Sequence, residues 1–144
     1  MIPLADASKI VDSALTYARD HDLAPMTVAV LDARGCVVSL KMEDGSSLLR
    51  PQIASGKGWS ALGMGFGTRN LQSRAQKLPS FFGALSDLAD GRVLPVPGGV
   101  LVRDGDGSVV GACGASGDVA ENDEACVVAA IEGAGFTADP GTPE

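Results

Sequence analysis

The sequence has few aromatic side chains, few cysteines and a single histidine, and each shortage narrows what the chain can be. Only 4% of the residues are aromatic, so we expect a core built mainly from Val, Leu, Ile and Ala. The three cysteines are odd in number, and no two of them have the spacing of metal ligands. We therefore expect free, mostly buried thiols in a reducing compartment.

Long apolar runs and an excess of basic residues are also missing. No apolar run reaches the length of a membrane span, and the first residues lack the basic and apolar regions of a signal peptide. With 11 basic and 18 acidic residues, the formal net charge is −7. This charge disfavours non-specific binding to nucleic acid or anionic membranes. We expect a cytoplasmic protein with neither partner.

The 144 residues suit one domain, expected over residues 1–134, with a flexible tail rich in Gly and Pro over 135–144. Apolar residues at helical spacing predict helices over Leu4–Asp20, Pro51–Met64, Arg69–Gln76, Pro79–Leu88 and Asp118–Gly133. Thr68 and Asp118 are the candidate N-caps of two of them. Two hairpins are predicted, pairing Met26–Leu31 with Cys36–Met42 and Gly99–Arg103 with Ser108–Ala115. This order predicts an α/β (α+β) fold, with an antiparallel sheet covered by helices.

Glycines gather at the outer ends of the second hairpin, within the stretch Val93–Asp123. They are Gly98, Gly99, Gly111, Gly114 and Gly117. Glycine beside a strand lets a ligand or another backbone come close. One interpretation is a pocket for an anionic ligand, built from bare N–H groups and the N-terminus of the last helix, with Ser116 as a hydrogen-bond donor. The alternative is that these glycines only permit a bulge and close packing of helix on sheet.

Five motifs in a fixed order carry a resemblance to a known family. They are Pro25–Gly35, Ile53–Lys57, Phe66-Gly67, Pro97–Val100, and Val110–Gly117 with Asn122–Glu124. Over about Leu4 to Ile131 the chain resembles the GlcG/HbpS family, also met as the C-terminal domain of PduO-type corrinoid adenosyltransferases. The resemblance implies a profilin-like α/β/α fold and a homo-oligomer, from a dimer to an octamer. It also implies a small-molecule ligand, which is haem or another tetrapyrrole in some members.

Lys57 and Asp123 are the candidate catalytic residues. Lys57 lies among small and apolar residues of a predicted helix, and the family often has lysine there. In a pocket it would act as a base or a Schiff-base nucleophile, with Asp123 as its acid or base partner. The alternatives are a solvent-directed lysine, or an ion pair with Asp123 or Glu124. Phe66 is a candidate ligand-binding residue in addition to the glycines and Ser116.

Candidate iron ligands are scarce. The family often has His after the glycine of the first hairpin, whereas this chain has Cys36. His21, the one imidazole, is the candidate haem ligand, and the alternative is a structural role at a helix C-terminus. Cys36 would ligate haem as a thiolate or serve as buried packing. Arg69 and Arg74 would bind haem propionates or form a solvated face.

Three hypotheses about function follow. The first is an oligomeric GlcG/HbpS-type protein that binds haem, another tetrapyrrole or another small molecule. The second is a cofactor-independent enzyme of a catabolic pathway, which isomerises or hydrolyses a small acid or carbonyl compound with Lys57 and Asp123. The third is an accessory assembly protein without a ligand.

Overall fold

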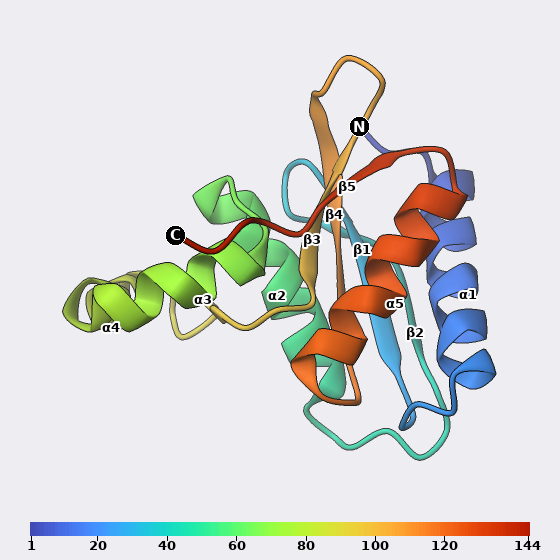
Figure 1. Ribbon diagram of the computed structural model, residues 1–144, viewed down its shortest axis with the longest axis horizontal. Helices are drawn as coiled ribbons and strands as arrows, with labels where there is room; N and C mark the ends of the chain where they lie inside the picture. Colours follow the sequence, from blue (N-terminus) through green and yellow to red (C-terminus); the bar gives the residue numbers. More distant parts are fainter.

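The computed structural model describes residues 1–144 and contains five helices and five strands (Figure 1). The helices are α1 (Leu4–Asp20), α2 (Arg50–Met64), α3 (Thr68–Lys77), α4 (Pro79–Leu88) and α5 (Ala120–Gly133). The strands are β1 (Thr27–Asp32), β2 (Val37–Met42), β3 (Gly99–Arg103), β4 (Val109–Ser116) and β5 (Thr137–Asp139). None of the helices combines the length and the apolar character that a membrane crossing requires.

The strands form one antiparallel sheet in the order β2-β1-β4-β3-β5. Both predicted hairpins are confirmed, as β1–β2 and β3–β4. Gly35 and Gly107 have φ values of +87° and +81° in the two turns, a left-handed conformation that glycine adopts without a Cβ clash. The hairpins join through β1 and β4, where Val28 lies opposite Ala115. β4 is therefore the middle strand of the sheet.

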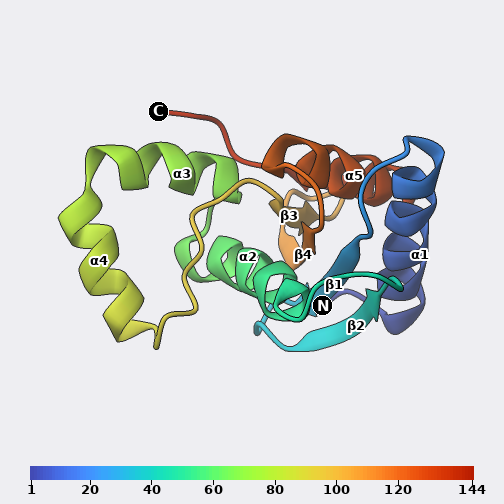
Figure 2. The same cartoon turned by 90° about the horizontal axis from the view of Figure 1, so that it is seen from below.

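Helices cover both faces of the sheet, which confirms the expected α/β/α layers. Figure 2 shows α1 and α5 on one side of the strands and α2 on the other. Successive side chains of a strand point to opposite faces. Accordingly, Val28 and Val30 of β1 belong to the main core cluster with α1 and α5, whereas Ala29 and Leu31 pack with Ala54 of α2.

The main core is mostly aliphatic, as the shortage of aromatic residues predicts. One face of α1 is buried at helical spacing, through Ala7, Ile10, Val11, Ala14 and Ala18. Cys113 and Cys126 are buried free thiols. Burial raises the pKa of both thiols, that of Cys126 to about 12, so both stay protonated. Cys36 is exposed, so it does not serve as buried packing.

Two helix starts differ from the predictions. Gly67, not Thr68, is the N-cap of α3, and Thr68 lies inside the helix. The Thr68 hydroxyl instead contacts β3, accepting the Gly99 N–H at 2.8 Å and donating to the Gly99 carbonyl oxygen at 3.2 Å. Val119, not Asp118, caps α5. The Asp118 carboxylate accepts a hydrogen bond from the backbone N–H of Ala24, in the loop before β1, at 2.8 Å. Both polar side chains tie neighbouring elements together, so tertiary contacts override the local capping signal.

Helices α3 and α4 form an arm that extends away from the sheet (Figures 1 and 2). Of the α4 side chains only Phe82 is buried. Leu78, Phe81 and Leu88 are 54%, 51% and 82% exposed. Exposed large apolar side chains on a projecting part of a protein are typical of a contact surface.

The last residues differ from the flexible tail that the sequence predicts. Thr137–Asp139 form β5, which pairs with the outer edge of β3. Asp139 accepts a hydrogen bond from Arg103 at 2.9 Å. Beyond it, Glu144 pairs with Arg74 of α3 at 3.0 Å. The chain after α5 is thus part of the sheet, and its last residue contacts the arm.

Candidate functional site

Lys57 and Asp123 form a buried ion pair between helices on opposite faces of the sheet. The Lys57 Nζ lies 3.2 Å from Asp123 Oδ2 and donates to the Ala115 carbonyl oxygen at 2.9 Å. The other carboxylate oxygen accepts the Asp118 N–H at 2.8 Å. The two side chains are 4% and 2% exposed. Of the interpretations open from the sequence, an internal ion pair is the one that the structure shows.

Burial dominates the titration of this pair. It lowers the pKa of the Lys57 ammonium, and the attraction of Asp123 opposes the shift only in part. It also raises the pKa of the Asp123 carboxyl against the attraction of Lys57. Buried ion pairs whose mutual attraction does not fully offset the loss of hydration occur in structural contacts as well as in active sites. Catalysis would need a path for substrate, and neither side chain lines a cavity.

The glycines near this pair are occupied by the protein itself. A Cβ on Gly114 would overlap the Ala54 carbonyl oxygen, and one on Gly99 would overlap the Lys57 carbonyl oxygen. Gly98 has φ +120°, and a Cβ there would lie 2.9 Å from the Lys57 Nζ. These glycines therefore let α2 lie directly on β3 and β4. They line none of the cavities, so the structure shows their packing role and no pocket over them.

Ser116 and Gly117 lie at the end of β4. The Ser116 hydroxyl accepts a hydrogen bond from Arg50 Nη1 at 2.9 Å and is buried. A Cβ on Gly117 would overlap the Pro25 carbonyl oxygen. The positive charge of Arg50 also contributes to lowering the pKa of Lys57. This end of the sheet is thus a closed polar cluster, in which two predicted ligand-binding residues already have protein partners.

The other predicted site residues lie apart from this cluster. Phe66 is 38% exposed and lies under the Arg74 guanidinium, 4.3 Å from its ring centroid. Arg69 forms a bidentate pair with Glu124, with a shortest contact of 2.8 Å. His21 is exposed after α1, where its ring stacks on Tyr17 at 3.8 Å between centroids. The structure does not bring these side chains together around one ligand volume.

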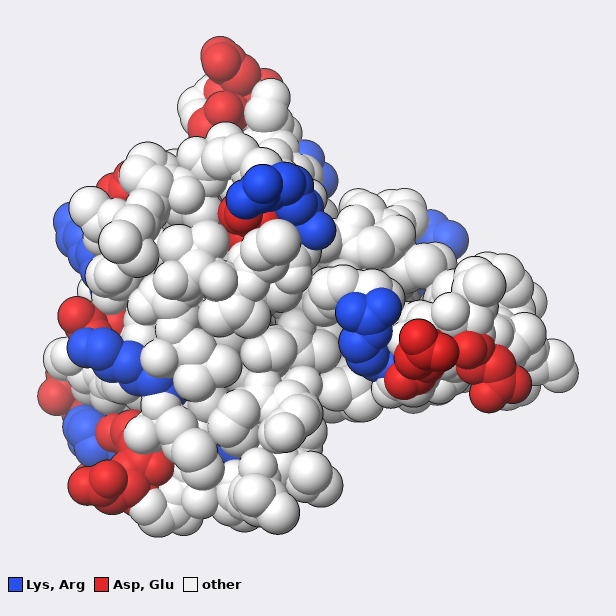
Figure 3. Space-filling view, turned by 180° about the vertical axis from the view of Figure 1, so that it is seen from behind, with Lys and Arg blue, Asp and Glu red and all other residues white.

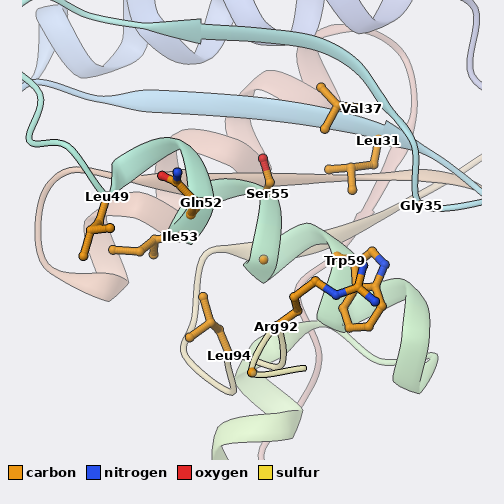
Figure 4. A pocket seen from close by; sticks show the side chains of 12 residues that line it. Leu31, Gly35, Val37, Leu49, Gln52, Ile53, Ser55, Trp59, Arg92 and Leu94 are labelled. Carbon is orange, nitrogen blue, oxygen red and sulfur yellow. The ribbon is translucent and has the colours of Figure 1, made fainter. Parts of the chain in front are cut away.

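A different part of the molecule holds the best-formed cavity. It has a volume of about 470 Å³, within the range of small-molecule sites. Its walls come from the β1–β2 hairpin, the outer side of α2 and the segment after α4 (Figure 4). The lining residues are Leu31, Gly35, Val37, Leu49, Gln52, Ile53, Ser55, Gly56, Trp59, Gly91, Arg92 and Leu94.

Trp59 and Arg92 stand together at one end of this cavity. The Arg92 guanidinium carbon lies 4.0 Å from the centroid of the indole ring, within cation–π distance. The indole also packs against the turn, since a Cβ on Gly35 would lie 3.1 Å from it. Trp59 also borders two smaller cavities, of about 310 and 200 Å³. The hollow region around α2 is therefore centred on this one indole.

The cavity face carries little charge. Figure 3 views the molecule from the α2 side, and its Lys, Arg, Asp and Glu side chains lie mostly towards the rim and the projecting parts. Most of the middle of the face is uncharged, and a blue group stands where the arm meets the body. No three His, Cys, Asp or Glu side chains gather as a metal site. The face suits a mainly apolar ligand better than a hydrophilic one.

Sequence reasoning missed this cavity. The sequence predicts Trp59 only as part of a helix and Arg92 only as part of an extended segment. One signal was available, because Trp59 is the only tryptophan in a chain poor in aromatic residues. Its partners lie in segments 24 and 33 positions away, at Gly35 and Arg92, and no local pattern connects them.

Comparisons with known proteins agree on the fold. The family model described as haem degrading protein HbpS-like matches residues 2–132. The solved PduOC–haem complex has a TM-score of 0.85 at 24% identity, covering 94% of this chain and 96% of that one. The ORFY protein of Klebsiella pneumoniae has a TM-score of 0.84 at 26% identity, covering 93% and 90%. A double mutant of HbpS from Streptomyces reticuli has a TM-score of 0.79 at 24% identity, covering 91% and 85%.

No protein of curated function is significantly similar to the chain. The structural similarities at 24% identity speak for the fold alone, and the family match spans nearly the whole folded region. The glycine-packed sheet, the order of helices and hairpins, and the family model all lead to the same assignment. The chain belongs to the HbpS-like family.

Proposed function

We propose that the protein binds haem or another tetrapyrrole in the cavity beside α2. The observation that carries the proposal is the cavity of about 470 Å³ with apolar walls and one cation, Arg92. Support also comes from the family description, which names haem degradation, and from the similar fold of the PduOC–haem complex. The Lys57–Asp123 pair gives the enzyme hypothesis no support, because it is closed to solvent.

The lining residues fit the macrocycle better than they fit its metal. Leu31, Val37 and Ile53 offer apolar surface, and Arg92 offers a partner for a propionate. The lining contains no His, Cys, Met or Tyr, the residues that commonly ligate haem iron. Cys36 lies between two lining residues in the sequence but is not itself one of them. We therefore propose that the ring and its carboxylates, and not an iron ligand, supply most of the affinity.

Titration with haem and with metal-free protoporphyrin IX tests this proposal. Binding is followed at the Soret band and by quenching of Trp59, the chain's only tryptophan. Both porphyrins are expected to saturate one site per chain with affinities within about tenfold of each other. No saturable change with either porphyrin would overturn the proposal.

A filled cavity gives the matched variant. Ser55→Phe places a ring inside the lining, and we expect at least tenfold weaker porphyrin binding because the added volume competes with the ligand. Ser108→Phe adds the same ring at the exposed turn between β3 and β4 and is expected to bind as the parent does. Equal affinity in Ser55→Phe and the parent would place the site elsewhere.

We also propose that the protein is a homo-oligomer that uses the arm. Leu78, Phe81 and Leu88 expose apolar surface there, and covering it by another copy removes that surface from water. Phe81→Glu should lower the mass measured by light scattering, whereas Asp87→Asn on the same helix should not. An unchanged oligomer in Phe81→Glu would exclude this part of the arm from the interface.

A further inference from the structure

Arg92 differs from the other cations of the chain in having an apolar cavity beside it and no carboxylate partner. Seven ion pairs within 4.0 Å involve Lys or Arg side chains, and Arg92 is in none of them. Its one side-chain hydrogen bond runs from Nε to the Ala89 carbonyl oxygen, at 3.2 Å. The four N–H bonds at Nη1 and Nη2 thus have no protein acceptor.

The backbone on either side of Arg92 is fixed. Ser60 of α2 donates to the Arg92 carbonyl oxygen at 3.3 Å and accepts the Leu94 N–H at 2.8 Å. Ser60 is only 1% exposed. Before Arg92, Asp90 and Gly91 both have positive φ values, 55° and 75°, which turn the chain out of α4. The guanidinium is therefore presented from a segment that is anchored to the helix lining the cavity.

Stacking holds the guanidinium in place without using its donors. The indole of Trp59 lies under its carbon at 4.0 Å, and the four N–H bonds at Nη1 and Nη2 remain free at the edge of the planar fork. Figure 4 shows Arg92 beside Trp59 at one end of the cavity, while Leu49, Ile53 and Ser55 line the rest. A ligand with its apolar part against α2 would thus meet the cation at one end only.

We propose that this cavity is specific for ligands that join a flat apolar body to a carboxylate, and that Arg92 binds the carboxylate. Leu31, Val37 and Ile53 would contact the body, and the free Nη groups would donate two hydrogen bonds to the two oxygens. The inference concerns the cavity of the proposed function and rests on it for the location of the site. It adds that the site discriminates an acid from its neutral counterpart, and that Arg92 is the residue responsible.

The expected specificity for an acid has a physical reason both in the guanidinium and in the ligand. A guanidinium with four unused donors gains charge-assisted hydrogen bonds from a carboxylate, whereas a neutral ester or amide of the same shape accepts weaker ones. In a chain of net charge −7, general attraction of anions cannot supply this preference. The preference must come from Arg92 itself.

The test compares acids with their neutral counterparts at this site. Protoporphyrin IX is paired with its dimethyl ester, and 2-naphthoate with 2-naphthamide. Affinities are measured by isothermal titration calorimetry, and quenching of Trp59 by the porphyrins reports that the cavity is occupied. We expect each acid to bind about 10- to 100-fold more tightly than its neutral counterpart.

Variants assign the preference to one side chain. Arg92→Met keeps an apolar stem over Trp59 and should remove the preference for the acid, whereas Arg92→Lys should keep part of it. Arg74→Met is the matched control, because Arg74 also stacks on an aromatic ring but is paired with Glu144 outside the cavity. Equal binding of acid and neutral ligand to the parent, or an unchanged preference in Arg92→Met, would overturn the inference.

The two proposals fail in different ways. If porphyrins do not bind but 2-naphthoate binds with dependence on Arg92, the inference stands and the tetrapyrrole function falls. If porphyrins bind and Ser55→Phe weakens them, yet Arg92→Met leaves the acid preference intact, the function stands and the inference falls.

Discussion

Lys57 and Trp59 lie two residues apart on α2, and they belong to two regions with opposite use of charge. Lys57 is turned toward the sheet, where its ammonium group pairs with Asp123 and donates to a backbone carbonyl oxygen. Trp59 is turned outward and carries Arg92, whose charge no protein carboxylate meets. The first region is closed by backbone contacts at glycines, and the second is open to a cavity.

The difference shows that a buried charged residue need not be the one with donors left free for a ligand. Residue type, setting among small residues and family resemblance all favoured Lys57 as the functional cation. The geometry gives Lys57 a full set of partners and leaves Arg92 with free donors. The presence of a partner, which a single sequence does not reveal, separates a structural charge from one available to a ligand.

The largest expected effect comes from breaking the closed region. Lys57→Met leaves the Asp123 carboxylate buried without its counter-ion, and we expect a loss of about 3–5 kcal/mol in the free energy of unfolding. Urea denaturation measures it. The double variant Lys57→Met/Asp123→Leu should recover most of the loss, because no unpaired charge remains. A double variant as unstable as the single one would mean that the pair itself stabilises the fold.

The same variant has a defined dependence on pH. Burial already raises the pKa of Asp123, and removing Lys57 removes the attraction that opposes this shift. A carboxyl with a raised folded pKa favours folding below its unfolded pKa and loses that contribution as pH rises through the folded pKa. The deficit of Lys57→Met should therefore grow as the pH is raised from about 4, the ordinary pKa of an aspartate, towards neutral. A deficit that is constant across this range would show that lost packing, not charge, is responsible.

The next effect comes from the glycine contact that closes this region. Gly114→Ala forces α2 away from β4, because the new methyl group would overlap the Ala54 carbonyl oxygen. We expect a loss of about 1–3 kcal/mol. Gly83→Ala in α4 meets no atom within 4 Å and should gain up to about 1 kcal/mol from helix propensity. Equal stabilities of the two variants, from thermal or urea unfolding, would contradict close packing at β4.

A smaller effect is expected from the open region. Arg92→Met loses the stack on Trp59, worth about 0.5–1 kcal/mol at an exposed site, and leaves no buried charge unpaired. Urea denaturation should thus show a nearly unchanged fold in the variant whose ligand preference is altered. A loss as large as that of Lys57→Met would show that Arg92 is a structural residue, and the contrast between the two regions would disappear.

The smallest effect is expected at the predicted haem ligand. His21 stacks on Tyr17 at the exposed end of α1 and lines no cavity. His21→Ala should leave porphyrin affinity and the Soret position of the haem complex unchanged. A shifted Soret band in this variant would restore His21 as an iron ligand and move the site away from α2.

The fold could be predicted from the sequence because most of its signals are local. The helix Leu4–Asp20 follows from apolar spacing, and both hairpins follow from Gly-containing turns between β-rich segments. The strand Thr137–Asp139 could not be predicted, because it has three residues in a Gly- and Pro-rich segment and forms only against β3. Neither Thr68 nor Asp118 is the N-cap of its helix, and each side chain also bonds another element, β3 or the loop before β1.

The site was harder to predict because contacts between distant segments define it. The Lys57–Asp123 pair joins residues 66 positions apart; the sequence suggested it as one alternative among several, and the assembled fold selects it. The glycines are predicted as places of close approach, and at Gly99 and Gly114 the group that approaches is the backbone of α2. The cavity needs a hairpin turn, a helix face and the segment after α4 in one place, and only the assembled fold provides that.

Strand β5 decides where this chain can be shortened. The family match ends at residue 132, before the three residues that cover the outer edge of β3. A chain cut there would present the N–H and C=O groups of Leu101–Arg103 as an unpaired edge, the geometry through which sheets of separate molecules join. We expect such a shortened protein to aggregate even though it keeps four strands, four complete helices and all but the last residue of α5. Strand β5 thus prevents β3 from pairing with the sheet of another molecule.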